Sequence, residues 1–248
     1  MQVQAAIGSE RLTAKVDYGL DAPGEVRKLL IRGGVLTALA VAIWIANGAN
    51  AVSSIFLSIG LTFAIVALVM IWSSRVAKIR MRDRLLDLLP WRGDEKVLDV
   101  GCGRGLLLIG AAKRLKKGKA TGVDIWQSQD LSGNSPEATL ENAKAEGVAD
   151  RVKIESADAR KLPIPDASVD TVVSSLAIHN IPSREERVRA LGEMVRVLKP
   201  GGRVAILDIL HVSDYAKELR RRGIEEVELS GMNFLWCLPT RYVTGRKP

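Results

Sequence analysis

The apolar positions of this chain form one unbroken block, followed by shorter runs at regular intervals. From Gly33 to Ser74 no Asp, Glu, Lys or Arg occurs, a stretch of 42 residues. A helix needs about 20 apolar residues to cross a bilayer, so the block is too long for one span and suited to two. Turn residues at Asn47–Asn50 interrupt it near its middle. We predict a two-helix transmembrane hairpin over 31–74, with helices at about 31–47 and 51–72.

Three other interpretations of this apolar block stay open. A cleaved signal peptide would have an apolar region of about 7–15 residues, nearer the N-terminus. A second interpretation is a hairpin buried in the core of a soluble domain, although so long a run without a charged residue is unusual there. A hairpin that dips into one leaflet is open because the first segment is short. We carry the spanning hairpin forward, because a helical hairpin satisfies its backbone groups internally, as lipid requires.

Basic residues flank the block on both sides. The block is preceded by Arg27, Lys28 and Arg32 and followed by Arg75, Lys78, Arg80, Arg82 and Arg84. Asp83 is the one acidic residue within the second group. Positive flanks are typical of the cytoplasmic side of a membrane protein. We therefore expect an integral membrane protein with both termini and the folded domain in the cytoplasm.

Residues 75–90 are predicted to form a basic amphipathic juxtamembrane helix. Apolar residues recur there at helical spacing beside the basic positions, at Val76, Ile79, Leu85, Leu86 and Leu89. The apolar side of such a helix has two interpretations: it lies in the membrane interface, or it packs on the domain that follows.

From Trp91 onward the pattern changes to short β-rich runs that alternate with helical stretches. This alternation predicts an α/β domain over 91–248, built on a mostly parallel sheet with helices on both faces. Residues 1–30 are left as an N-terminal segment that could act as a lid. Strands are expected at 96–100, 120–124, 152–155, 168–175, 203–209, 225–230 and 234–244, and helices at 104–115, 136–146, 184–198 and 215–222.

Composition and charge agree with a membrane segment joined to a soluble domain. The chain has 248 residues, 47% hydrophobic and 26% charged, which excludes a mainly disordered protein. Its net charge of +8 comes without an aromatic-interleaved basic stripe or a zinc-finger spacing, so we expect no nucleic-acid partner and no metal. Two cysteines, Cys102 and Cys237, do not make a disulfide framework, which favours a reducing compartment.

The first predicted strand runs into a glycine-rich turn, Asp99-Val-Gly101-Cys-Gly103-Arg-Gly105. Glycines at alternate positions allow a tight turn and a close approach of the backbone to a ligand. The spacing differs from that of a dinucleotide fold, and a carboxylate two residues before the first glycine suits a ligand with a positive group.

On these residues the chain resembles the class I S-adenosylmethionine (SAM) dependent methyltransferases, and the ubiquinone and menaquinone methyltransferases in particular. The resemblance covers roughly 87–247 and includes Gly122-Val-Asp124, Ser156-Ala-Asp158-Ala159, the run from Pro165 to Ser175, and Leu198-Lys-Pro-Gly-Gly-Arg203. It implies a Rossmann-like seven-stranded sheet in the order 3-2-1-4-5-7-6. It also implies that SAM is held by Asp99, Val100, Gly101, Cys102, Gly103, Gly105, Asp124, Ile125, Trp126, Ala157, Asp158, Ala159, Ser174 and Ser175.

Several of these residues also have a simpler structural interpretation. Asp99 and Asp124 could cap backbone at the surface, and Asp158 could cap a turn. Cys102 is better explained as a small buried side chain that fills space than as a nucleophile. Trp126 is explained equally well as a packing residue.

The candidates for chemistry lie in loops that follow the strands. His179, after the fourth strand, is the first choice for a general base, which is needed only if the acceptor must lose a proton. His211, after the fifth strand, is a second choice, and Tyr18 could belong to an N-terminal lid over the site. The candidate acceptor-binding residues are His179, Asn180 and His211.

We expect a membrane-anchored SAM-dependent methyltransferase that acts on an apolar or membrane-associated small molecule: a quinone-like ring, a lipid or a thiol. Membrane lipids are the expected surroundings. The acceptor atom and the oligomeric state stay open. The alternative is a membrane scaffold or sensor that binds SAM without turnover, and aminopropyl transfer is a weaker third interpretation.

Overall fold

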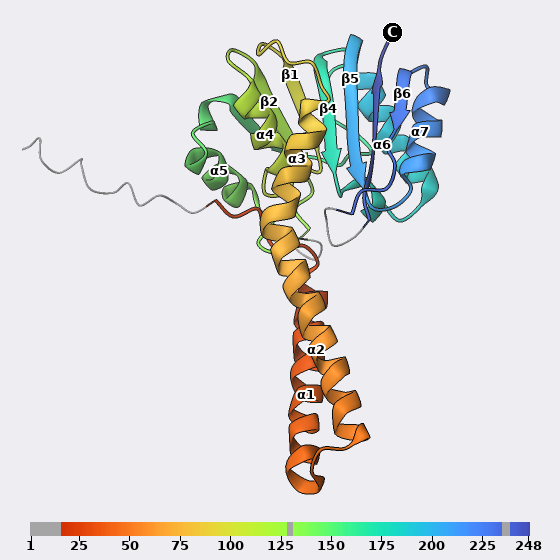
Figure 1. Cartoon of the computed structure of the whole chain (residues 1–248). Helices are drawn as coiled ribbons and strands as arrows, with labels where there is room; N and C mark the ends of the chain where they lie inside the picture. Colours follow the sequence, from red (N-terminus) through yellow and green to blue (C-terminus); the bar gives the residue numbers. More distant parts are fainter. Residues whose placement is uncertain (1–15, 128–130, 235–238) are drawn as a thin grey trace, which may run out of the picture.

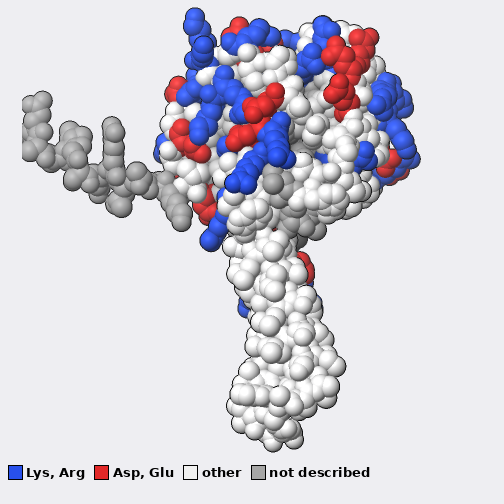
Figure 2. Space-filling view, in the orientation of Figure 1, with Lys and Arg blue, Asp and Glu red and all other residues white. Residues whose placement is uncertain are grey.

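The computed structural model describes residues 16–127, 131–234 and 239–248. An α/β domain stands on a long two-helix hairpin that projects from one end of it (Figure 1). Lys, Arg, Asp and Glu cover the domain, whereas the hairpin is almost entirely white up to its junction with the domain (Figure 2). The segregation of apolar and charged residues along the sequence is therefore a segregation in space.

The hairpin consists of α1 (Pro23–Asn47) and α2 (Ala51–Trp72). Helix α1 starts eight residues before the predicted boundary at 31, because Pro23 stands in its first turn, where proline is favoured. The extra turns make this helix 25 residues long. The side chain of Asn50 caps α2 by accepting a hydrogen bond from the Ser53 N–H at 3.0 Å, which explains why the predicted turn ends there.

Small residues let the two helices of the hairpin approach closely. Gly33 and Ala40 of α1 are buried, as are Ser53, Gly60 and Ala67 of α2, so each set repeats every seven residues. A Cβ at position 60 would lie 2.6 Å from the Thr37 hydroxyl oxygen and 3.0 Å from the Gly33 carbonyl oxygen. Small residues at such a seam are typical of helix pairs in lipid.

Helix α2 continues without a break through the π-helix η1 (Ser73–Ala77) into α3 (Lys78–Asp87). Met81, Leu85 and Leu86 of α3 are buried against α4 (Leu106–Arg114), where Gly110 leaves room for the approach. The apolar side of the juxtamembrane helix therefore packs on the domain, which is one of its two compatible interpretations. The basic face is only partly solvated, since Lys78 and Arg82 of the predicted basic flank are buried.

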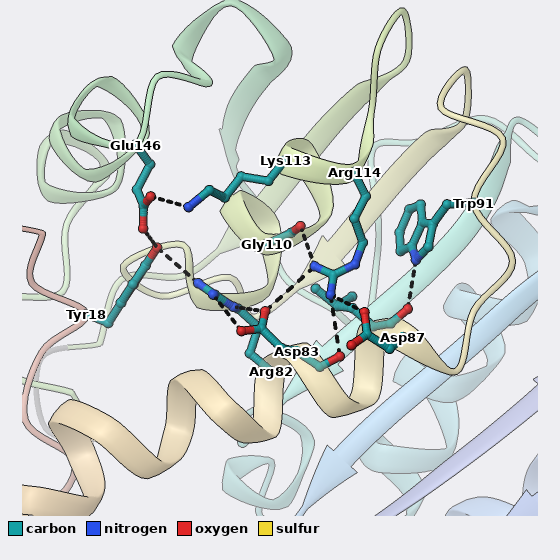
Figure 3. A network of polar contacts seen from close by, with 10 residues as sticks. Tyr18, Arg82, Asp83, Asp87, Trp91, Gly110, Lys113, Arg114 and Glu146 are labelled. Atoms are coloured by element: carbon teal, nitrogen blue, oxygen red, sulfur yellow. Dashed lines mark hydrogen bonds and ion pairs between the residues drawn. The ribbon is translucent and has the colours of Figure 1, made fainter.

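Polar contacts fasten α3 to the domain around this interface (Figure 3). The Trp91 indole N–H donates to the Leu86 carbonyl at 2.7 Å, and Arg114 of α4 contacts Asp87. The Arg82 guanidinium pairs with its neighbour Asp83 at 2.9 Å. These contacts make α3 part of the domain, so the hairpin is joined to it by a continuous helix.

The sheet has seven strands in the order β3-β2-β1-β4-β5-β7-β6, as the resemblance implied. Only β7 runs antiparallel to its neighbours; the other pairings, from β3 to β5, are parallel. The strands are β1 (Lys96–Val100), β2 (Lys119–Asp124), β3 (Val152–Ser156), β4 (Val169–Ser175), β5 (Leu198–Asp208), β6 (Glu225–Leu229) and β7 (Arg241–Arg246).

Helices cover both faces of this sheet, and the connections are short. They are α5 (Pro136–Ala145), α6 (Arg184–Val197) and α7 (Val212–Arg221), with 3-10 turns η2 (Ala149–Arg151) and η3 (Ile178–Asn180). Several predicted boundaries were wrong. Strand β5 begins at Leu198, five residues before the predicted start at 203, and α7 begins at Val212, three residues before the predicted start at 215. Helix α4 begins after Gly105, which has a φ of 87° outside the helix, and the last strand begins only at Arg241, after Pro239. Predicted residues 235–238 of that strand lie outside the described residues.

Candidate functional site

A cavity of about 390 Å³ lies at the carboxyl ends of the parallel strands. This is the edge at which ligands bind in open α/β sheets, and the volume is within the usual range for small-molecule sites. Its wall includes the glycine-rich turn and the loops after β2, β3, β4 and β5. Met70, Ser74 and Lys78 also line it, so the end of α2 and the start of α3 belong to the same cavity.

The glycine-rich turn places bare backbone against this cavity. Gly101 has a φ of 74°, and a Cβ there would lie 2.2 Å from the Cβ of Ala177, so only glycine fits. The N–H groups of Gly101 and Cys102 both donate to the Val123 carbonyl, at 2.8 and 3.1 Å. The turn is therefore held by β2, and its outer surface is left for a ligand.

Asp99 closes the floor of the cavity at the end of β1. Its Oδ2 oxygen accepts a hydrogen bond of 2.8 Å from the Leu108 N–H in the first turn of α4. Its Oδ1 oxygen is buried and has no hydrogen-bond partner among the residues that the structure describes. Burial raises the pKa of Asp99 to about 8; the Leu108 hydrogen bond opposes this shift, and the charge of Asp124 adds to it. An unpaired buried oxygen suits a donor supplied by a ligand.

Asp124 ends β2 on the same cavity. Its carboxylate accepts hydrogen bonds from the Gly103 N–H at 2.8 Å and the Trp126 N–H at 2.6 Å, one on each oxygen. Each carboxylate oxygen can accept further hydrogen bonds, so the pair of oxygens is both oriented by backbone and open to a ligand.

Asp158, after β3, lines the cavity but is already engaged. Arg160 donates to it through its backbone N–H at 2.8 Å and its guanidinium at 2.6 Å. The side-chain hydrogen bonds with Arg160 lower the pKa of Asp158, in spite of some burial. Capping of a turn is therefore one role of Asp158. Its neighbours Ala157 and Ala159 also line the cavity.

His179 meets a buried carboxylate that sequence reasoning did not select. Its Nδ1 atom lies 2.5 Å from Oδ1 of Asp208, which ends β5 and is fully buried. The backbone N–H of His179 donates to the other oxygen of Asp208 at 3.1 Å, and the Tyr215 hydroxyl lies 3.3 Å from that oxygen. His179 and Asn180 both line the cavity. The backbone N–H of His179 is hydrogen-bonded to Asp208, whereas Nδ1 lies at ion-pair distance from the carboxylate without forming an aligned hydrogen bond.

Most of the predicted cofactor residues line the cavity together. They are Asp99, Val100, Gly101, Cys102, Gly103, Asp124, Ile125, Ala157, Asp158, Ala159 and Ser175. Cys102 is buried, and burial raises the pKa of its thiol well above the ordinary value, with Asp99 and Asp124 adding to the shift, so it is no ready nucleophile.

Three predicted cofactor residues lie outside the cavity lining. Ser174 is fully buried and donates to the Val100 carbonyl at 2.7 Å, because alternate residues of a strand face opposite sides. Gly105 lies directly before α4 and forms the end of the turn without lining the cavity. The Trp126 indole donates to the Ser156 hydroxyl at 2.8 Å and packs on the apolar core, as its alternative interpretation held.

His211 and Tyr18 also lie outside the cavity lining. His211 is exposed at the start of α7 and is not part of the cavity wall. Tyr18 is buried between the domain and α3, where its hydroxyl donates to Glu146 at 3.1 Å and lies 3.4 Å from Arg82 (Figure 3). Burial raises the pKa of Tyr18 well above its ordinary value, helped by the charge of Glu146, so the phenol stays protonated.

Residues 16–22, the strap, nevertheless close one side of the cavity, through Asp21 and Ala22. The ammonium group of Lys78 donates to the Gly19 carbonyl at 2.6 Å and the Tyr18 carbonyl at 2.9 Å, and it pairs with Asp21 at 3.2 Å. On the other side the Arg104 guanidinium donates to the Asp17 carbonyl at 2.7 Å. The strap thus ties the top of the hairpin to the glycine-rich turn.

Comparisons with known proteins agree with this geometry. Residues 98–206 match the family described as "Methyltransferase domain". The chain is 39% identical over 136 residues to 27-O-demethylrifamycin SV methyltransferase of Amycolatopsis mediterranei, which covers 55% of this chain and 46% of the relative. It is 31% identical over 137 residues to the ubiquinone/menaquinone biosynthesis C-methyltransferase of Roseobacter denitrificans, covering 55% and 51%.

Over these matched residues the α/β domain is similar to the SAM-dependent methyltransferases. The crystal structure of a SAM-dependent methyltransferase from Aquifex aeolicus superposes with a TM-score of 0.53 at 20% identity, covering 67% of this chain and 89% of that one, which supports the fold. The chain spans about half of the length of the two relatives above.

SAM is the cofactor of this family, and the residues of the methyltransferase domain fit it. Asp99 offers an unpaired carboxylate oxygen to a cationic amino group. Gly101 leaves the backbone exposed to the cofactor where any other residue would place a side chain. Sequence reasoning found these residues because they follow strands in a local motif. It missed Asp208, although a polar residue at the carboxyl end of a strand is a signal that could have found it.

Proposed function

We propose that the chain is a membrane-anchored SAM-dependent methyltransferase for an apolar small molecule. The observation that carries the proposal is the unpaired buried oxygen of Asp99 in a cavity that also holds His179. One group calls for a cationic ligand and the other is a base, and a methyl transfer from SAM to an acidic acceptor needs both at one place.

The cofactor end of the cavity is formed by the first two strands. Asp99 would hold the amino group of SAM, with the backbone of Gly101 and Gly103 alongside, and Asp124 would take the two ribose hydroxyls. Ala157, Asp158 and Ala159 would surround the adenine ring. When bound, SAM supplies an electrophilic sulfonium methyl group, so the task of the chain is to position the acceptor and to exclude water.

The acceptor end of the cavity has a histidine oriented for proton transfer. Because Nδ1 of His179 contacts Asp208, Nε2 is the nitrogen left for the acceptor. SAM would supply the methyl group, with the methyl–sulfur bond breaking and the neutral thioether S-adenosylhomocysteine leaving. Nε2 of His179 would take the proton of the acceptor oxygen, nitrogen, sulfur or carbon, and the carboxylate of Asp208 would stabilise the resulting imidazolium. Asp208 touches His179 and not the acceptor, so it is a positioning residue.

The hairpin supports the membrane part of the proposal. Both of its helices are long and apolar enough to cross a bilayer by length and composition. Outside the seam of small residues their large side chains point outward: Val35, Ile45, Ile55, Ile65 and Leu68 are all exposed. A soluble protein rarely exposes an apolar surface of this extent, whereas lipid accepts it.

The names of the relatives suggest which class of acceptor to test. They act on a rifamycin precursor in one case and in ubiquinone and menaquinone biosynthesis in the other. A quinone-like ring fits both the apolar cavity wall and a bilayer source, and a lipid or an apolar thiol are the other acceptors that we propose to test. The competing function is a SAM-binding scaffold that performs no transfer.

Transfer of a labelled methyl group tests the proposal. The full chain in vesicles is incubated with methyl-labelled SAM and with quinone, lipid and thiol fractions of a membrane extract. We expect label in an organic-soluble product, and loss of that label in His179→Ala with SAM binding retained. SAM binding without transfer to any fraction would support the scaffold instead.

A further inference from the structure

The loops after β5 and β6 present large apolar side chains to solvent at the end of the domain from which the hairpin projects. Leu210 is 53% exposed, Met232 65% and Phe234 73%. Single exposed apolar residues are ordinary, but these three belong to two loops at one edge of the sheet. Register shows this: Asp208, which ends β5, pairs with Arg241, which begins β7, so the β6–β7 connection starts and ends beside the end of β5.

Hydrogen bonds hold the described parts of the connection that carries Met232 and Phe234. Asn233, between them, forms a bridge with Thr240 through hydrogen bonds of 2.8 and 2.9 Å in both directions. The Arg241 guanidinium donates to the Ser230 carbonyl at 2.9 Å, which braces the base of the connection. The backbone thus holds both side chains outward in spite of the cost of exposing them to water.

The hairpin leaves the domain at this same edge. The arrowheads of β4 and β5 point toward the end of the domain at which α1 and α2 emerge (Figure 1). Met70 and Ser74, at the top of α2, share the cavity wall with Ile209, which follows β5 directly. The cavity is therefore bounded by the hairpin on one side and by the loop of Leu210 on another.

The length of α2 sets the level of a bilayer surface, if the hairpin spans one as proposed above. From Ala51 to Trp72 the helix has 22 residues, which at about 1.5 Å per residue gives roughly 33 Å, the thickness of a hydrocarbon core. The exposed Arg75, the first charged residue beyond α2, then lies at the headgroups. Lys28 and Arg32 of α1 lie lower, because Gly33 packs beside Gly60 and Ala64 of α2, and their long side chains extend along the helix to the same headgroups. The cavity wall at Met70 and Ser74 lies at that level too.

We infer that the face formed by Leu210, Met232 and Phe234 is a second membrane-contact surface, which rests on the lipid headgroups and turns the mouth of the cavity toward the bilayer. This inference rests on the proposed membrane anchor. An acceptor dissolved in the bilayer then reaches His179 by moving along the top of α2 between the hairpin and the loop after β5, without passing through bulk water.

Lipid-borne quenching of site-specific fluorophores tests this contact. The full chain is prepared with Cys237→Ser, so that the remaining native cysteine, Cys102, is buried and does not label. Single cysteines are then introduced at Leu210 and Phe234, both exposed, and labelled with an environment-sensitive dye. Two matched sites calibrate the signal: Ile59, exposed on α2, and Lys117, exposed at the opposite end of the domain before β2.

Two sets of vesicles of phosphatidylcholine and phosphatidylglycerol are used, one with a lipid that carries a shallow nitroxide and one with a lipid that carries a nitroxide deep in the acyl chain. We expect quenching at positions 210 and 234 by the shallow label, at position 59 by the deep label, and at position 117 by neither. If position 59 is quenched but positions 210 and 234 are no more quenched than position 117, the second contact is overturned and the anchor is left intact. No quenching at 59 either would remove the anchor as well. A blue shift at 234 that grows with protein concentration and needs no lipid would assign the face to a second copy of the chain instead.

Discussion

Nδ1 of His179 lies 2.5 Å from the Oδ1 oxygen of the buried Asp208, although His179 belongs to the turn after β4 and Asp208 ends β5. The contact leaves one imidazole nitrogen for the cavity and places a negative charge behind the other. If this pair removes the acceptor proton, Asp208→Asn should lower kcat for methyl transfer by about 100-fold or more. The KM for SAM should stay the same, because Asp208 touches no cofactor residue.

The control for this prediction is Asp214→Asn, a carboxylate that is exposed at the start of α7 and pairs only with Lys217. Its kcat should match that of the native chain. Equal kcat values for the native chain and Asp208→Asn would show that the histidine needs no carboxylate, and that positioning alone drives the transfer.

The second prediction concerns the pH dependence of SAM binding. Burial raises the pKa of Asp99 to about 8, so below that pH the free protein holds a proton there. A cationic amino group of SAM favours the ionised carboxylate, so binding must release this proton. The affinity for SAM should therefore rise by roughly tenfold or more between pH 6 and pH 8, as measured by titration calorimetry.

Asp99→Asn has no proton to release, so its affinity should be weaker and nearly flat over the same range. The sign for stability is opposite. Because the folded pKa lies above the ordinary value of 3.8, Asp99 makes the native chain less stable as the pH rises from about 4 to 8. A flat SAM affinity in the native chain would contradict the role of Asp99.

The third prediction concerns the strap. Lys78 is buried, and it binds two strap carbonyls and Asp21. Lys78→Met should release residues 16–22, lower the stability by about 1–3 kcal/mol and weaken SAM binding, because Asp21 and Ala22 line the cavity. Thermal unfolding in detergent and hydrogen exchange of the Leu20 amide, which donates to Ser132 at 2.7 Å, measure the two effects.

Lys28→Met is the matched control, since Lys28 forms an exposed pair with Glu25 at 2.6 Å on the outside of α1. Exposed pairs contribute little to stability, so this variant should behave as the native chain. Equal effects of the two substitutions would mean that the strap is not held by the ammonium group.

The fourth prediction uses two adjacent glycines of α1. A Cβ on Gly33 would lie 3.0 Å from the Gly60 carbonyl oxygen, whereas a Cβ on Gly34 meets nothing within 4 Å. Gly33→Leu should push the hairpin apart and lower its thermal midpoint by an amount that corresponds to about 1–3 kcal/mol. Gly34→Leu should leave the midpoint unchanged or raise it, because leucine is the better helix former. A fall of equal size in both variants would contradict the packing of the hairpin.

The fold and the cofactor end of the site were predictable because their signals are local. The order of the strands was implied by the family resemblance, which rests on motifs at strand ends. Asp99, Gly101 and Asp124 each stand at a fixed place in such a motif. The turn at Asn50 was likewise visible, since a capping side chain acts three residues away.

The acceptor end and the strap were predictable only in part. Sequence reasoning selected His179 and an N-terminal lid, but it missed Asp208 and the Lys78–Asp21 pair, because these contacts join residues far apart in the chain. Lys78 and Asp21 are separated by the whole hairpin, and nothing near either residue marks the pair. The basic pattern of α3 suggested solvent or lipid headgroups for Lys78, yet strap carbonyls provide its acceptors and allow it to be buried. Ser174 and Ser175 were both expected to contact the cofactor. Adjacent residues of a strand face opposite sides of the sheet, so Ser175 lines the cavity and Ser174 does not.

Calorimetric titration of SAM into the full chain in detergent tests the central claim most directly, with Asp124→Asn as the test variant and Asp150→Asn, an exposed carboxylate beside η2, as the control. We predict binding of one SAM per chain, unchanged in Asp150→Asn and weakened by about 10-fold or more in Asp124→Asn, because an amide cannot accept both ribose hydroxyls. No heat of binding to the native chain, or equal affinity in all three proteins, would contradict the assignment of this cavity as the SAM site.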